Sequence, residues 1–112
     1  MNITTTTDGT TAEITPNEDI DYTKLSEIRA VVATLPSTVT DVTWRMENAR
    51  FMDIAGLHLL NDQRRAARRR CGRLTVTGLQ PQPRRLLEVA SEVFPAMDWA
   101  SFLPSAPSPA RV

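Results

Sequence analysis

The fold is decided by the stretch FMDIAGLHLL, residues 51–60, in which an apolar strand end runs into Asp-x-x-Gly and an apolar-periodic helix follows. Asp53 is placed to cap this helix, because its carboxylate can accept N–H bonds from the first turn at the positive helix end. Gly56 falls where a side chain would obstruct close approach. Asp-x-x-Gly also occurs in ordinary strand-to-helix connections, so its meaning depends on the rest of the chain.

The chain before this junction predicts a hairpin and then a helix. Two Thr-rich segments, 2–7 and 10–15, flank Asp8-Gly9, which is typical of a two-residue turn between short strands. The helix is expected within residues 22–35, because Pro36 follows where a helix should stop. Its apolar residues recur at helical spacing: Leu25, Ile28, Val32 and Leu35.

A strand over residues 39–46 is indicated by alternation, with Val42, Trp44 and Met46 on one face. The helix after the junction is expected over about 54–70, with arginines on its exposed face and Gly72 as its cap. Its inward stripe is Leu57, Leu60, Ala67 and Cys71. Cys71 is most simply a small core residue.

The last third of the chain predicts a short strand over 74–77, a turn over 78–81 and a helix opened by Pro83. The inward residues of that helix are Leu86, Leu87, Ala90 and Val93. A further strand near 97–102 is possible, and the Pro-, Ser- and Ala-rich tail 104–112 is expected to be disordered. Alternating strands and helices indicate one layered α/β domain over residues 1–103.

Length and composition favour one soluble cytoplasmic module. The 112 residues suffice for a single core, 41% are hydrophobic, the formal net charge is zero, and no apolar run approaches a membrane span. The polar start lacks the features of a signal peptide. The single histidine, the single cysteine and the four scattered glycines form no convincing catalytic, phosphate-binding or metal-binding set, so we expect neither an enzyme, a metal nor a cofactor.

The stretch 51–60 resembles the STAS domains of bacterial anti-sigma factor antagonists, whose helix begins at Asp-Ser-Ser-Gly-Leu or Asp-Ser-Ala-Gly-Leu after an apolar strand. Phe51, Asp53, Gly56 and Leu57 match. Residues 72–89, GRLTVTGLQPQPRRLLEV, also resemble the family, which carries Gly-x-Leu-x-Leu-x-Gly, a Pro-containing turn and a helix starting with Arg and Leu pairs. The resemblance implies a STAS-like domain with a mixed sheet of four to five strands and about three helices.

In that family the residue after the Asp is a Ser or Thr that a kinase-type anti-sigma factor phosphorylates, and Ile54 holds this position here. Ala55 also lacks a hydroxyl, and the nearest hydroxyls, Thr43 and Ser91, match no phosphoacceptor position. The resemblance therefore implies a non-phosphorylatable antagonist that binds a kinase-like, ATP-binding anti-sigma factor and so releases a sigma factor to activate transcription. The expected partner-binding residues are Asp21, Asp53, Ile54, Ala55, Gly56, Leu57, His58, Arg64, Arg65 and Arg68.

For two of these residues, Asp21 and His58, a structural role is the alternative to a partner contact. Asp21 precedes the first helix in a loop that the resemblance places beside the phosphorylation loop, so its carboxylate could contact a partner, cap the helix, or do both. His58 lies in the first turns of the motif helix, where it is either near a partner or a structural histidine.

Eight arginines with no acidic residue among them lie in residues 64–85: Arg64, Arg65, Arg68, Arg69, Arg70, Arg73, Arg84 and Arg85. They are either a solvated helix surface or a surface complementary to an acidic anti-sigma factor, which would raise the association rate. Nucleic-acid binding is not expected, because no aromatic stacking series or helix-turn-helix pattern accompanies them.

Two rival functions fit the same fold. One is a STAS adaptor or scaffold subunit of a transporter or signalling assembly, and the other is a degenerate module without an anti-sigma partner. The protein found bound to this chain in cells would separate the three.

Overall fold

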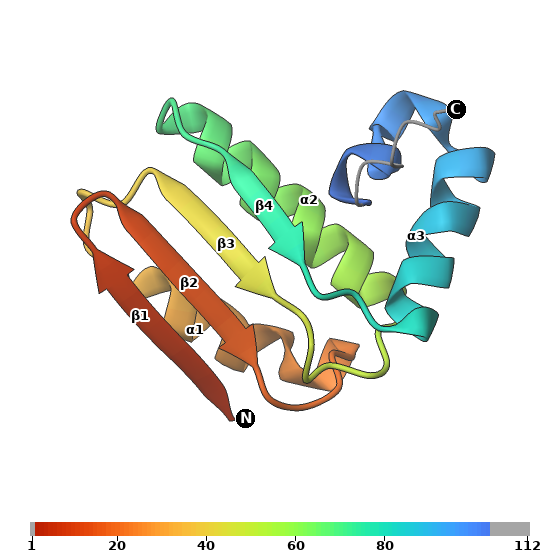
Figure 1. Cartoon of the computed structure of the whole chain (residues 1–112), viewed down its shortest axis with the longest axis horizontal. Coiled ribbons are helices and arrows are strands. Elements are labelled where there is room, and N and C mark those ends of the chain that lie inside the picture. The colour runs from red at the N-terminus through yellow and green to blue at the C-terminus, as the bar shows by residue number, and fades with distance from the viewer. Residues whose placement is uncertain (1, 104–112) are drawn as a thin grey trace, which may run out of the picture.

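The computed structural model describes residues 2–103, so the tail expected at 104–112 lies outside the described residues. A four-stranded sheet and three α-helices form the fold, as predicted (Figure 1). In chain order the elements are β1 (Ile3–Asp8), β2 (Thr11–Pro16), η1 (Tyr22–Lys24), α1 (Leu25–Ala33), β3 (Asp41–Arg45), α2 (Ile54–Arg69), β4 (Leu74–Thr77), α3 (Pro81–Val93), η2 (Pro95–Met97) and η3 (Trp99–Phe102), where η marks a 3-10 helix.

The sheet is mixed, with strand order β1-β2-β3-β4. β1 and β2 are antiparallel, whereas β3 and β4 run parallel to β2. Parallel neighbours need crossover connections, and α1 and α2 provide them on the same side of the sheet (Figure 1). The confirmed topology brings the loop after β2 and the loop after β3 to the same end of the sheet.

The opening hairpin is confirmed, with its turn displaced by one residue. Asp8 pairs with Thr11, so the two loop residues are Gly9 and Thr10 instead of Asp8-Gly9. Gly9 has φ of +62°, which suits a tight hairpin turn that a residue with a Cβ would strain.

The helix α3 differs from the prediction at both ends. α3 begins at Pro81, two residues before Pro83, because Gln80 is the cap and Pro81 occupies the first helical position. Val93, expected to face inward, is exposed at the end of α3.

The end of α2 corrects the interpretation of Cys71 and Gly72. Cys71 takes the left-handed conformation with φ of +60°, and its N–H donates to Arg68 O at 3.0 Å while Gly72 N–H donates to Ala67 O at 2.9 Å. This is a Schellman motif, which directs Cys71 to the surface instead of the core. Gly72 is needed for a different reason, since a Cβ there would overlap the backbone of Thr40.

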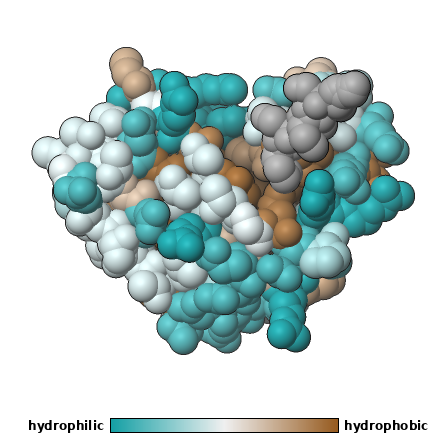
Figure 2. All heavy atoms as spheres, viewed as in Figure 1, coloured by the Kyte–Doolittle hydropathy of each residue, from teal (hydrophilic) through white to brown (hydrophobic). Residues whose placement is uncertain are grey.

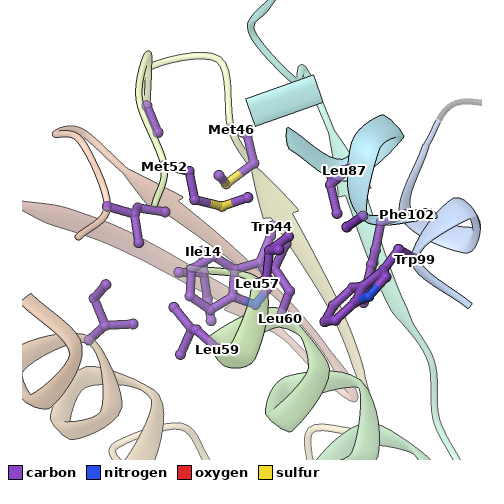
Figure 3. Close-up of a cluster of buried hydrophobic side chains, with 14 residues drawn as sticks. Ile14, Trp44, Met46, Met52, Leu57, Leu59, Leu60, Leu87, Trp99 and Phe102 are labelled. Atoms are coloured by element: carbon purple, nitrogen blue, oxygen red, sulfur yellow. The ribbon is translucent and has the colours of Figure 1, made fainter. Parts of the chain in front are cut away.

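The possible strand near 97–102 is replaced by η2 and η3. A 3-10 helix has three residues per turn, so Trp99 and Phe102 fall on one side, and both are buried. They join the hydrophobic core that Trp44, Leu57 and Leu60 form between the sheet and α2 (Figure 3). Hydrophobic side chains are also visible between the sheet and α3 in the space-filling view (Figure 2).

Candidate functional site

The site is built where the chain enters α2. β3 ends at Arg45, so the apolar strand end expected at Phe51 is wrong: residues 46–53 are irregular apart from one bridge between Met52 and Ile20. Backbone hydrogen bonds from Ile20 N to Phe51 O (2.9 Å) and from Asp53 N to Ile20 O (3.1 Å) hold the two loops together. This pairing places the segment before α1 directly beside the start of α2.

Asp53 caps α2, as predicted, and it also binds the segment before α1. Its Oδ1 accepts from Ala55 N at 2.9 Å, which satisfies a free N–H in the first turn of α2. Its Oδ2 accepts from Tyr22 N at 3.2 Å, at the start of η1. One carboxylate therefore fixes the start of α2 relative to the segment before α1.

Asp21 caps η1, which leads into α1. Its Oδ1 accepts from Thr23 N at 2.9 Å and also from the Thr23 hydroxyl. The Thr23 side-chain hydrogen bond, followed by backbone hydrogen bonds and nearby Lys24, holds the pKa of Asp21 below its ordinary value. The capping alternative is thus confirmed, and the partner contact stays a prediction.

Three large apolar side chains are exposed around this pair of loops. Ile54, the first residue of α2, is 64% exposed, Tyr22 is 73% exposed and Phe51 is 45% exposed. Tyr22 is hydrogen-bonded to Asp53, and Phe51 and Ile54 are close to Asp53 in the chain. Apolar side chains gathered on an otherwise polar surface are typical of an interaction site.

Gly56 and Ala55 are less exposed than Ile54. A Cβ on Gly56 would overlap the Met52 side chain, so the close approach that this glycine permits is the packing of Met52 onto α2. Gly56 is buried and Ala55 is half-buried. Leu57, the last residue of the motif, is also buried and packs in the core.

An apolar groove adjoins Ile54. It has a volume of about 390 Å³ and lies between the first turns of α2 and the segment after α3. Its lining residues are Ile54, Leu57, His58, Phe94, Met97 and Trp99. His58 is exposed at the groove. The second wall is not among the predicted site residues, because the sequence indicates a possible strand near 97–102.

Arg64 is the largest departure from the expected site. It was expected on the exposed face of α2, but it is only 7% exposed. Its Nη1 donates to Asp98 O and Ser101 Oγ, both at 2.7 Å, and its Nη2 donates to Met97 O at 2.7 Å. The guanidinium lies 4.5 Å from the centroid of the Phe102 ring. Arg64 therefore holds the second wall of the groove against α2.

Arg64 lies close to a second positive charge, that of Arg68. Burial, followed by repulsion from Arg68, lowers the pKa of Arg64, and Asp98 partly opposes this. Arg65 and Arg68 are exposed, as expected, and neither forms an ion pair with any residue of the described part of the chain.

Within residues 2–103, no three His, Cys, Asp or Glu side chains are arranged to hold a metal ion. None of the helices in this range is long and apolar enough to span a membrane. The arrangement offers an apolar and partly charged surface, and surfaces of this kind are typical of interaction sites.

Comparisons with known proteins agree with this geometry. The family model described as STAS domain matches residues 2–94. Among the solved structures, "Structure of the Anti-Sigma Factor Antagonist SpoIIAA in its Unphosphorylated Form" aligns with a TM-score of 0.73 and 20% sequence identity, covering 98% of this chain and 93% of that one. No curated protein sequence gives a significant match.

Proposed function

Because the chain belongs to the STAS domain family, we propose that it is an anti-sigma factor antagonist that phosphorylation does not switch off. It binds a kinase-type anti-sigma factor through the surface around the start of α2. The occupied anti-sigma factor then cannot hold its sigma factor, and transcription proceeds. The observation that carries this proposal is the 64% exposure of Ile54, an apolar side chain without a hydroxyl at the position where the resemblance places the phosphorylated residue.

The rigidity of the start of α2 supports a binding role. Asp53 ties Ala55 and Tyr22 to one carboxylate, so the exposed apolar residues are held in place before a partner arrives. Less conformational entropy is then lost on binding. Burial of the remaining exposed surface of Ile54 would contribute about 1 to 2 kcal/mol.

The absence of a hydroxyl at residues 54 and 55 determines how the proposed antagonist is regulated. A phosphoryl group brings about −1.5 to −2 charge at neutral pH, and in an apolar interface it opposes binding through desolvation and repulsion. Ile54 and Ala55 cannot accept this group. The proposed antagonist is therefore always competent to bind, and its abundance or competition from phosphorylatable relatives controls it.

Affinity capture from the native cells tests the proposal. The tagged chain and its Ile54→Glu variant are compared, and we expect a kinase-like, ATP-binding anti-sigma factor to be retained only by the unaltered chain. A carboxylate at the first residue of α2 favours the helix electrostatically, so the variant should keep its fold. Ala30→Glu, which adds the same charge on the exposed side of α1, is the matched control and should retain the partner.

Incubation with the captured anti-sigma factor and Mg-ATP tests the missing switch. The intact mass of the chain should not change, whereas Ile54→Ser should gain the mass of one phosphoryl group and then lose affinity. Phosphorylation of the unaltered chain would contradict the proposal. Recovery of transporter components in the capture experiment would instead support the adaptor function.

A further inference from the structure

The groove beside Ile54 presents an apolar cavity with no occupant among the described residues. One wall is the start of α2 with Leu57 and His58, and the other is the segment after α3 with Phe94, Met97 and Trp99. Phe94 and Met97 are exposed as well as Ile54. Since Arg64 fixes the second wall to α2 through three hydrogen bonds to residues 97–101, the groove is preformed.

A positive surface continues from the groove along the same face of α2. Ile54, His58, Asn61, Arg65 and Arg68 recur at alternating intervals of four and three, which places them on one side of a helix. At a rise of about 1.5 Å per residue, Arg65 lies about 10 Å beyond His58 and Arg68 about 15 Å beyond it. Neither arginine is paired with a carboxylate in residues 2–103, and the neighbouring Arg64, although buried, carries a further positive charge.

We propose that this surface binds an acidic amphipathic helix of a partner protein, with an apolar side chain in the groove and carboxylates beside Arg65 and Arg68. The groove alone would accept any apolar side chain of suitable size. The two unpaired arginines select the partner, because a segment carrying carboxylates about two turns from its apolar anchor satisfies both parts of the surface. The inference deepens the proposed function and rests on it: it names the kind of segment that an anti-sigma factor presents to α2.

A synthetic peptide tests the recognition without the anti-sigma factor. The probe is an amphipathic helical peptide with Leu and Phe anchors and two Glu residues about two turns further on, and its matched control has Lys in place of Glu. In ¹⁵N-labelled protein, the Glu peptide should shift the amide signals of His58, Met97, Arg65 and Arg68. We expect the Lys peptide to bind at least about tenfold more weakly.

Variants of the two parts of the surface make the test specific. Met97→Glu should abolish binding, and Arg65→Glu with Arg68→Glu should weaken the Glu peptide about tenfold and strengthen the Lys peptide. The control double variant, Arg73→Glu with Arg85→Glu, changes the net charge equally at exposed arginines outside α2 and should bind as the unaltered chain does.

Three results would overturn the inference: equal affinity for the two peptides, equal loss in the control double variant, or self-association of the chain that protects the groove residues. The failure of the proposed function is separate. If Ile54→Glu loses the captured anti-sigma factor while Arg65→Glu with Arg68→Glu keeps it, the antagonist function stands and the acidic helix does not.

Discussion

Two segments flank the start of α2, and side chains of opposite charge hold them. On the side of the loop before α1, the carboxylates of Asp19, Asp21 and Asp53 accept bonds from backbone N–H groups. On the side of residues 95–103, the guanidinium of Arg64 donates to the backbone carbonyls of Met97 and Asp98. The same helix is thus fixed to one neighbour by acceptors and to the other by a donor.

The two sets of hydrogen bonds differ in how far they are buried. The three carboxylates are partly or fully exposed, and each replaces hydrogen bonds that water could supply. Arg64 is buried, so removing its guanidinium would leave acceptors in a partly buried place without the three hydrogen bonds that it donates. We expect one arginine to matter more to the fold than any one of the aspartates.

Arg64→Met should have the largest effect on stability. The variant keeps the apolar part of the side chain and removes the donors, so the free energy of unfolding should fall by about 2 to 4 kcal/mol. Urea denaturation followed by tryptophan fluorescence measures the loss, because Trp99 packs beside Arg64. Arg68→Met, an exposed change of the same chemistry, should cost less than about 0.5 kcal/mol. Equal stability of the two variants would show that Arg64 does not hold the segment.

Asp53→Ala should have an intermediate effect. It removes the cap of α2 and the acceptor for Tyr22 N, so we expect a loss of about 1 kcal/mol in the free energy of unfolding. Asp53→Asn keeps a capping oxygen and should lose clearly less. Denaturant titration of the three proteins gives the order, and an alanine variant as stable as the asparagine variant would exclude the capping role.

The smallest effect concerns Asp21 and pH. The pKa of Asp21 is lower in the folded chain than its ordinary value of 3.8, so its charge stabilises the fold above that value and this contribution disappears as the pH falls through the folded pKa. Below about pH 4, the unaltered chain should therefore lose stability more steeply than Asp21→Asn. Unfolding titrations at several acidic pH values compare the slopes. Parallel profiles would mean that the hydrogen bond from Thr23 does not favour the charged form.

The sequence allowed the hydrogen bonds between near neighbours to be predicted, but not those between distant residues. The caps of Asp21 and Asp53 were predictable because each carboxylate bonds an N–H two residues later, and local spacing shows this directly. The bond from Asp53 to Tyr22 spans 31 residues, and the bonds of Arg64 to residues 97–101 span 33 to 37. No local pattern marks such partners, so Arg64 was placed with the exposed arginines by charge alone.

The remaining differences from the prediction have separate origins. Trp99 and Phe102 are three residues apart, a spacing that fits a turn of 3-10 helix better than the alternation of a strand, and this signal was available in the sequence. The burial of Gly56 under Met52 depends on the path of the loop between them, which spacing does not define. The layered α/β class was predictable because strands and helices alternate along the chain, and the mixed sheet followed from the family resemblance, whereas the strand order was not predicted.

The exposed position of Cys71 makes the chain easy to observe in solution. It is the single cysteine, and it follows the last turn of α2, about 25 Å along the helix axis from Ile54. A maleimide fluorophore attached there would leave the start of the helix uncovered. Energy transfer to a second dye on a partner would then report both the distance and the lifetime of the complex, with no engineered thiol and no competing site of attachment on the chain.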